Sequence, residues 1–443
     1  MRSPRQRGSV LVGVLWCLVL LAVVVVGVLH QARLGLFIAR HHGDEVQARY
    51  LAIAGIEKAK ALLALDARDR RRAGRGHSSE LFNAPGLFKD ITLGPGRFSV
   101  LRPGTPAEGG GWIHGVADEE GCLNINVAGT NELLRLPGMT HDAASAIVDW
   151  RDNDNTVSAG GAEAGHYASL NPPYLPRNGP FQTPRELLMV RGISPQMLLG
   201  RQSFRQGGSA SADLRDGGWR DVITVRSGVA NLSHSGQGRV NLQSADERAL
   251  SGVRGFTPDI ARAIVARRGN NRFESVLDLL ELTAAQPAGP IGPGGSIGSP
   301  RFNPANASNP GAPRLVGEEL LLQVADDLTT DDRDLLEGAI NVNSAGIEVL
   351  MCLPGIDRTL AQAIVNRRNS SGPFANTVAL LRVPGLTRDL LRPILPRLTT
   401  RSETFRILAE GVVPSRDTRR RIEVVVRIGA RDITTLAWRE DDL

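Results

Sequence analysis

The sequence predicts an α+β protein in which a long N-terminal helix and an antiparallel sheet carry inserted α-helical repeats. The chain opens with an uncharged apolar run whose helical pattern continues well beyond it. It then contains three copies of one helical repeat, and it ends in segments that alternate apolar and polar residues. The 443 residues, 42% hydrophobic and 22% charged, leave room for about three folded domains after the first helix.

The N-terminal run carries no charge from Ser9 to Leu29 and directly follows MRSPRQR. About 20 apolar residues suffice to cross a hydrocarbon layer of about 30 Å. The arginines before the run place the N-terminus in the cytoplasm and the rest of the chain beyond the membrane. A cleavable secretory signal is the alternative, but its apolar region is shorter and ends in small residues that are absent here.

The helical pattern continues through residues 31–75 without a break. Apolar and small residues recur there at steps of three and four, which predicts one buried stripe on a helix of more than 50 residues in all. The stripe consists of Ala48, Leu51, Ala52, Gly55, Ile56, Ala59, Leu62 and Leu63.

Strands are predicted on both sides of the repeats. Residues 76–122 hold two short candidates, at 97–102 and 111–117. Residues 399–443 hold three more, at 404–413, 419–428 and 432–438, and their alternation is typical of a half-buried antiparallel sheet.

The repeat begins at Asn124, Asn241 and Asn341, and a glycine follows each asparagine after 14 residues. An arginine follows each glycine after 13 residues. This organisation divides the chain as follows: leader 1–8, membrane span 9–30, continuation of the helix 31–75, first strands 76–122, first repeat with an acidic loop 123–202, strand and second repeat 203–284, Pro/Gly-rich linker 285–313, third repeat 314–398, and last strands 399–443.

Each copy contains a tight glycine turn between two helices, the helix-hairpin-helix pattern. The predicted turn glycines are Gly138, Gly192, Gly255, Gly355 and Gly385. Such hairpins often bind nucleic-acid phosphates through backbone amides, with a second glycine two residues after the first. Thr140, Thr257 and Asp357 occupy that position here, and the Asp357 carboxylate would repel a phosphate. We therefore expect the hairpins to pack against protein, and we disfavour nucleic acid as a partner.

An acidic loop follows the first repeat's second helix. Asp149, Asp152, Asp154 and Glu163 surround a glycine-rich segment, and flexible oxygen ligands of this kind suit calcium. The spacing differs from that of a twelve-residue EF-hand loop. The alternative is a solvated loop with capping aspartates.

The remaining composition argues against catalysis and nucleic-acid binding. The net charge of +6 is dispersed along the chain, which favours a solvated surface over a nucleic-acid groove. The three cysteines show no zinc-binding spacing. Cys122 and Cys352 lie in different copies of the repeat, so we do not expect a disulfide between them. No G-x-S-x-G or H-E-x-x-H motif occurs, so we expect no enzyme.

The basic leader ending in Gly8, the small residue Ser9 and the apolar helix resemble the type IV pilin-like N-terminus. That resemblance implies cleavage after Gly8 by a prepilin peptidase and methylation of Ser9. Most such proteins carry Glu at the fifth mature position, where this chain has Gly13. The glutamate is usually missing in the minor pseudopilin K family of type II secretion.

The segments DEEGCLNIN, DWRDNDN, LLMVRGIS and TTLAWRED also resemble the pseudopilin K family, and the resemblance covers nearly the whole chain. It implies a pilin-like sheet with inserted hairpin domains, a bound calcium, a single span in the bacterial inner membrane and a periplasmic head. It also implies a non-enzymatic role at the pseudopilus tip in secreting folded proteins. The implied partners are minor pseudopilins of the I and J types, with the H type as a further candidate, and the major pseudopilin. The third repeat and the long linker depart from the family pattern. A membrane-anchored DNA receptor and a minor pilin of a type IV pilus stay open as alternatives.

Overall fold

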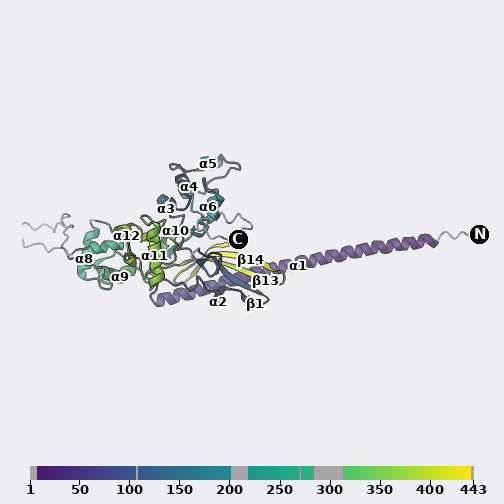
Figure 1. Ribbon diagram of the computed structural model, residues 1–443, viewed down its shortest axis with the longest axis horizontal. Coiled ribbons are helices and arrows are strands. Elements are labelled where there is room, and N and C mark those ends of the chain that lie inside the picture. The colour runs from purple at the N-terminus through teal and green to yellow at the C-terminus, as the bar shows by residue number, and fades with distance from the viewer. Residues whose placement is uncertain (1–6, 106–107, 201–217, 270, 284–312, 441–443) are drawn as a thin grey trace, which may run out of the picture.

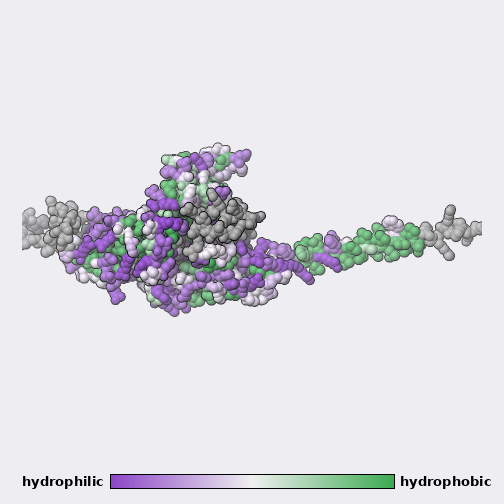
Figure 2. Space-filling view, viewed as in Figure 1, coloured by the Kyte–Doolittle hydropathy of each residue, from purple (hydrophilic) through white to green (hydrophobic). Residues whose placement is uncertain are grey.

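The structure is a computed structural model that describes residues 7–105, 108–200, 218–269, 271–283 and 313–440. Its first element is α1 (Arg7–Arg72), a helix of 66 residues and therefore about 100 Å long. The N-terminal half of α1 projects from the rest of the molecule as a rod (Figure 1) and is covered with apolar side chains (Figure 2). Among the described residues, α1 is the one helix long and apolar enough to cross a membrane.

The C-terminal half of α1 packs on the sheet through the predicted stripe. Ala48, Ala52, Ile56 and Ala59 are fully buried, whereas the apolar residues of the span are exposed. The stripe lies against Val100, Ile407, Ala409, Ile422, Val424 and Val426 from three strands. One continuous helix therefore joins the exposed apolar rod to the core of the head.

The sheet is antiparallel, and its order is β1 (Ile91–Leu93), β2 (Gly96–Pro103), β13 (Thr404–Val413), β14 (Thr418–Ile428) and β15 (Ile433–Arg439). Two short strands extend it, β3 (Trp112–His114) beside β2 and β4 (Ala117–Asp118) beside β13. After β4 the chain leaves the sheet, and it returns some 280 residues later as β13, which pairs with β2 on one side and with β14 on the other. The repeats are thus an insertion between neighbouring strands, which confirms the predicted α+β architecture.

Each repeat is a closed unit that begins and ends in a two-residue strand, and its two strands pair in parallel. The first unit comprises β5 (Leu123–Asn124), α3 (Thr130–Leu133), α4 (His141–Arg151), α5 (Ala164–Ala168), η2 (Pro184–Met189), α6 (Pro195–Leu199), η4 (Trp219–Asp221) and β6 (Ile223–Thr224). The second comprises β8 (Val240–Asn241), α7 (Glu247–Ser251), α8 (Pro258–Arg268), η5 (Val276–Glu281), α9 (Glu318–Val324), η7 (Ala325–Asp327) and β9 (Leu328–Thr329). The third comprises β11 (Ile340–Asn341), α10 (Ile347–Leu350), α11 (Arg358–Ser371), η8 (Thr377–Arg382), α12 (Arg388–Ile394), η9 (Leu395–Arg397) and β12 (Leu398–Thr399).

Among the described residues, three further elements belong neither to these units nor to α1 and the main sheet. The helix α2 (Pro85–Phe88) precedes β1, and β7 (Gly228–Ala230) pairs with β10 (Leu335–Glu337) between the units. The buried apolar residues of all three units belong to one continuous core. The units therefore form a single helical body, in which α8, α9, α11 and α12 lie at the end of the sheet away from the rod and α4, α5 and α6 lie above the sheet (Figure 1).

The repeated asparagine and arginine hold each unit closed. Each asparagine side chain accepts a hydrogen bond from the backbone N–H two residues later, which turns the chain out of the opening strand. Each arginine donates to backbone carbonyls just after that strand, as Arg368 does to Val342 and Ala345 at 2.8 Å. Arg151 and Arg268 make the corresponding bonds in the other units. The constant spacing between the asparagine and the arginine in the sequence therefore reflects hydrogen bonds that hold the end of the unit's second helix against the residues after its opening strand.

The structure draws two domain boundaries elsewhere than the sequence predicted. The strand assigned to the second repeat, β6, pairs with β5 and closes the first unit. Residues 314–329, assigned to the third repeat, supply the second hairpin and closing strand of the second unit, because β9 pairs with β8. The predicted Pro/Gly-rich linker, 285–313, lies outside the described residues except for its last residue.

Candidate functional site

The acidic loop of the first unit brings three carboxylates together where α4 ends and α5 begins. Asp149 lies in the last turn of α4, Asp152 is its C-cap residue, and Glu163 is the N-cap residue of α5. One ligand oxygen of each lies within 4.8 Å of the others. Asp149 is fully buried, and Glu163 is 3% exposed.

These carboxylates lack the partners that buried charges require. Oδ1 of Asp149, Oδ1 of Asp152 and both oxygens of Glu163 accept no hydrogen bond. Oδ2 of Asp149 accepts one from the N–H of Ser158 at 3.2 Å. Within the described residues, no Lys or Arg forms an ion pair with any of the three. Unpaired buried carboxylates are costly, so the cluster needs a cation or protons.

The protonation behaviour follows from this geometry. Burial, and next the neighbouring Asp152 and Asp149 charges, raise the pKa of Glu163. Burial is also the largest cause of the raised pKa of Asp152. Both carboxyls consequently hold their protons to higher pH than free carboxyls do when no cation is present.

The surroundings fix the loop around this cluster. Trp150 packs edge-on against Tyr167 and stacks on Phe181, and its indole N–H donates to Glu186. A β-carbon added to Gly161 would lie 2.0 Å from Oδ2 of Asp149, so only glycine lets the loop approach that carboxylate. The predicted ligands Asp149, Asp152 and Glu163 therefore converge in a small, preformed site.

Asp154, the fourth predicted ligand, is not part of the cluster. It is exposed, and its Oδ1 accepts a hydrogen bond from the N–H of Thr156 at 2.7 Å. This local turn, which short Asp/Asn runs favour, holds the side chain within its own backbone. The metal site predicted from the sequence is therefore corrected to three carboxylates.

The five predicted turn glycines have φ between +75° and +88°, the left-handed conformation that glycine adopts readily. Four of these five turns face a helix of the other hairpin in the same unit, and the turn at Gly138 has no such neighbour within 4 Å. A β-carbon on Gly355 would meet Leu390 at 2.5 Å, and one on Gly385 would meet Leu360 at 2.9 Å. Gly255 faces Leu320 and Gly192 faces Ala143 in the same way. The hairpins therefore pack in pairs, turn against helix.

In three of these hairpins, a capping side chain already occupies one amide at the N-terminus of the second helix, where a phosphate would bind. The side chains of Thr140 and Thr257 accept hydrogen bonds from the third N–H of the helices that follow them. Asp357 caps α11 in the same way, accepting from the N–H of Leu360 at 2.8 Å. These contacts favour protein packing over binding to a nucleic-acid backbone.

A junction of three consecutive acidic residues, not anticipated from the sequence, joins the sheet to the repeats. Asp118 accepts hydrogen bonds from Ser402 at 2.6 Å and from Ser344. Glu119 pairs with Arg406 at 3.1 Å. Glu120 accepts from the N–H groups of Gly228 and Thr404, and burial raises its pKa well above the ordinary value. The run DEE directly before the first repeat was the signal available in the sequence.

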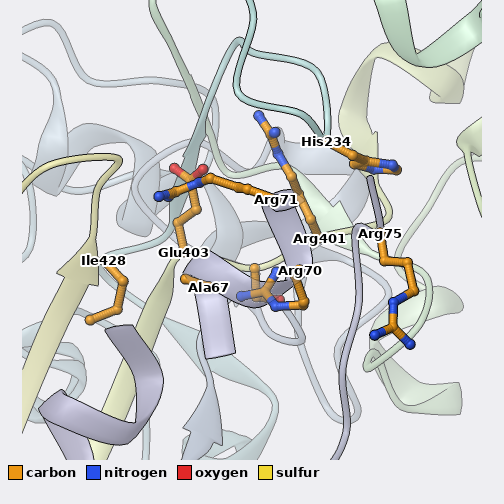
Figure 3. A pocket seen from close by; sticks show the side chains of 9 residues that line it. Ala67, Arg70, Arg71, Arg75, His234, Arg401, Glu403 and Ile428 are labelled. Carbon is orange, nitrogen blue, oxygen red and sulfur yellow. The ribbon is translucent and has the colours of Figure 1, made fainter. Parts of the chain in front are cut away.

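A basic hollow at the end of α1 is a joint between elements rather than a ligand site. Its arginines point in different directions (Figure 3). Arg71 donates to the carbonyls of Gly429 and Ala430, and Arg401 donates to those of Ala230 and Ser233. These bonds tie the end of α1 to the turn between β14 and β15, and they tie the segment before β13 to β7 and the residues that follow it.

Residues 121–200 match the family described as type II secretion system (T2SS), protein K, and residues 337–399 match the helix-hairpin-helix motif. A curated relative, type II secretion system protein K of Pectobacterium carotovorum subsp. carotovorum, is 28% identical over 219 residues, 44% of this chain and 61% of that protein. Endonuclease/exonuclease/phosphatase family domain-containing protein 1 of Xenopus laevis is 23% identical over 222 residues, 49% of this chain and 34% of that protein. The chain thus spans less than two thirds of either relative.

Among solved structures, the GspK-GspI-GspJ complex from the enterotoxigenic Escherichia coli type 2 secretion system contains a similar chain. The TM-score is 0.46 at 11% identity, and the match covers 91% of this chain and 99% of that one. The family match of residues 121–200 lies on the first unit, which holds the carboxylate cluster, and the protein K relative supports the same assignment. The first unit thus resembles the protein K family of type II secretion systems, and a curated protein K relative is similar over 44% of this chain.

Proposed function

We propose that the protein is a non-enzymatic minor pseudopilin, anchored in the bacterial inner membrane by the first half of α1 with its head in the periplasm. The observation that carries this proposal is the continuity of α1, which runs from an exposed apolar rod into the core of the sheet. Such a helix packs beside the helices of other pseudopilins while its head stays outside the lipid. The match of residues 121–200 to the protein K family, together with the curated protein K relative, supports the same role.

The shape of the head supports a place at the tip of the pseudopilus. Helices of the second and third units lie at the end of the sheet away from the rod (Figure 1), where another subunit would have to add, and the first unit widens the head above the sheet. The proposed partners are minor pseudopilins of the I and J types, with the H type as a further candidate, and the major pseudopilin below them. The solved complex that resembles this chain contains GspK together with GspI and GspJ.

Deleting the gene should leave folded exoproteins in the periplasm, because the pseudopilus would lack its tip. Full-length protein supplied in trans should restore secretion. A head delivered by a cleavable secretory signal in place of residues 1–29 should not, because it lacks the anchoring helix. Measurement of exoprotein in culture medium and periplasm checks this, and normal secretion in the deletion strain would contradict the proposal.

We also propose that a prepilin peptidase cuts after Gly8 and that Ser9 becomes the methylated N-terminus. Replacing Gly8 by Leu should leave the precursor uncut, because a peptidase specific for glycine cannot accept the branched side chain. Gly27→Leu is the matched control within the same helix, where an added β-carbon meets nothing within 4 Å. Gel mobility and the mass of the N-terminal peptide report cleavage. Normal processing of Gly8→Leu would show that this site is misassigned.

We further propose that the carboxylate cluster binds calcium through Asp149, Asp152 and Glu163. Three carboxylates with unpaired buried oxygens suit a hard divalent cation that prefers oxygen ligands. The bound ion would supply the positive charge that the site lacks. The three residues themselves connect the end of α4 to the start of α5, so their common ligand would fix the loop between the two helices.

A further inference from the structure

The hairpin between β13 and β14, residues 414–417, is the part of the head that lies beside the membrane-proximal turns of α1. Ala409 lies beside Gly55, and two residues further along β13 Gly411 lies beside Ala48. At the tip, Ser415 donates to Asp44 and the Arg416 guanidinium lies 5.1 Å from the ring centre of Phe37. β13 thus runs antiparallel to α1, toward the rod. Figure 1 shows β13 and β14 extending toward the rod.

The height of this tip follows from the rise of the helix. Phe37 lies eight residues after Leu29, the last residue of the uncharged run, and is thus about 12 Å beyond it. The headgroup layer extends about 5–8 Å beyond the hydrocarbon. The remaining gap is shorter than a Debye length of about 8 Å at physiological salt. Arg416 is therefore within electrostatic reach of the lipid phosphates.

Two further arginines lie on the same face of α1. Arg33 and Arg40 are seven residues apart, which places them in one row with Phe37 and Asp44. Both are exposed, and within the described part of the chain neither takes part in an ion pair. The Asp44 carboxylate pairs with Arg416 at a comparatively long distance of 3.4 Å. The row with its docked arginine therefore presents three guanidinium groups against one carboxylate.

The other charges of the hairpin are matched within the protein. Asp417 accepts hydrogen bonds from Arg419 at 3.0 Å, Glu410 accepts from Arg421 at 2.7 Å, and Glu45 accepts from Arg420 at 2.7 Å. The excess positive charge is consequently confined to Arg33, Arg40 and Arg416, the three nearest the span.

We infer that Arg33, Arg40 and the hairpin tip with Arg416 bind anionic lipid headgroups and hold the head at a fixed height above the membrane. Guanidinium groups suit phosphate because they donate parallel hydrogen bonds. The hairpin tip, residues 414–417, then acts as a strut, that is, a rigid contact that keeps a fixed distance between the sheet and the bilayer. The inference rests on the proposed membrane anchoring by α1.

Hydrogen exchange of the full-length protein in nanodiscs tests this, comparing phosphatidylcholine alone with phosphatidylcholine containing phosphatidylglycerol. Amides of residues 413–418 should exchange about fivefold more slowly in the anionic discs, since one arginine near an anionic surface contributes about that factor. The difference should vanish at about 1 M salt, where the Debye length is about 3 Å.

Two variants and one control separate the contributions. Arg416→Gln should remove the lipid-dependent difference. Arg33→Gln with Arg40→Gln, which leaves every contact of the hairpin intact, should reduce it. Arg358→Gln is the matched control, because Arg358 pairs loosely with Glu348 at 3.6 Å in the third unit, away from the rod. It should retain the full difference.

Amides of residues 10–29 report the anchor in the same samples. If they are protected in both discs while residues 413–418 exchange equally in the two lipids, the headgroup contact is overturned and the anchor stands. If residues 10–29 exchange freely, the proposed anchoring itself fails, and the strut with it.

Discussion

Gly411→Ala is expected to detach α1 from the sheet and to destabilise the head by about 3 kcal/mol or more. The added β-carbon would lie 2.0 Å from the carbonyl oxygen of Ala48 and 2.7 Å from the amide nitrogen of Ala52. Both are backbone atoms of α1, so no side chain can turn aside to relieve the clash. The helix must shift away from Ala52, Ile56 and Ala59, whose burial forms the seam with the sheet.

Gly43→Ala is the matched control, because it makes the same chemical change on α1 where nothing lies within 4 Å of the added carbon. It should stabilise the helix by about 0.5–1 kcal/mol, since alanine favours helix over glycine. Hydrogen exchange of residues 48–67 and of β13, in detergent-solubilised full-length protein, distinguishes the two. Equal protection of this seam in Gly411→Ala and wild type would show that helix and sheet are not in the contact described.

The same seam shows why part of the fold could be predicted from the sequence. The stripe from Ala48 to Leu63 has the spacing of one helix face, and the alternation of Ile422, Val424 and Val426 is that of one sheet face. Each pattern depends on local geometry alone. The structure confirms both, because the two faces pack against each other.

The features that the sequence did not predict depend on contacts between distant segments. A strand was predicted at β6, but its place in the first unit was not, because that place is defined only by the pairing of β6 with β5. The closing strand β9, two residues long and too short for any periodicity, is likewise defined only by its pairing with β8. In the second unit, α9 follows η5 only after residues 284–312, which hid the second hairpin of that repeat. Its identity follows from the parallel pairing of Val240 with Leu328.

The sequence predicted that acidic residues of this loop form the candidate metal site, but it did not predict which of the four acidic residues lie together. Four acidic residues within one loop indicated a cation site, whereas the choice among them depends on which way each side chain turns. Asp154 bonds to its own turn, and Glu163 leaves both oxygens free. The junction formed by Asp118, Glu119 and Glu120 was missed for a related reason. Its partners, such as Arg406 and Thr404, lie more than 280 residues away in the chain.

Calcium should stabilise the first unit strongly, and EDTA should remove that stabilisation. A ligand at 100 times its Kd contributes about 2.7 kcal/mol to the free energy of unfolding when it binds only the folded state. Because 1 kcal/mol shifts the Tm of a domain of about 150–250 residues by about 2–4 °C, we expect a rise in Tm of about 5–10 °C. Thermal unfolding of the detergent-solubilised protein with calcium and with EDTA measures the effect.

Glu163→Gln should abolish this response and should make the metal-free protein more stable than wild type. The substitution removes one of three like charges, and it breaks no hydrogen bond because both Glu163 oxygens are unpaired. Asp154→Asn is the matched control: the amide oxygen can still accept from Thr156, so the calcium response should persist. A lost response in Asp154→Asn, or a retained one in Glu163→Gln, would contradict the assigned ligands.

The pH dependence provides an independent sign. Asp152 and Glu163 have raised pKa values, so the metal-free folded protein binds more protons than the unfolded chain across the interval between ordinary and raised values. Its stability should therefore fall as pH rises through that interval and stay lower at neutral pH. Calcium needs the deprotonated carboxylates, so its stabilising effect should be largest at neutral pH and disappear on acidification. In wild type, the stability measured with EDTA should fall as pH rises, whereas the stabilisation by calcium should increase as pH rises. In Glu163→Gln, both dependences on pH should be weaker. A calcium effect that grew on acidification would exclude these carboxylates as the ligands.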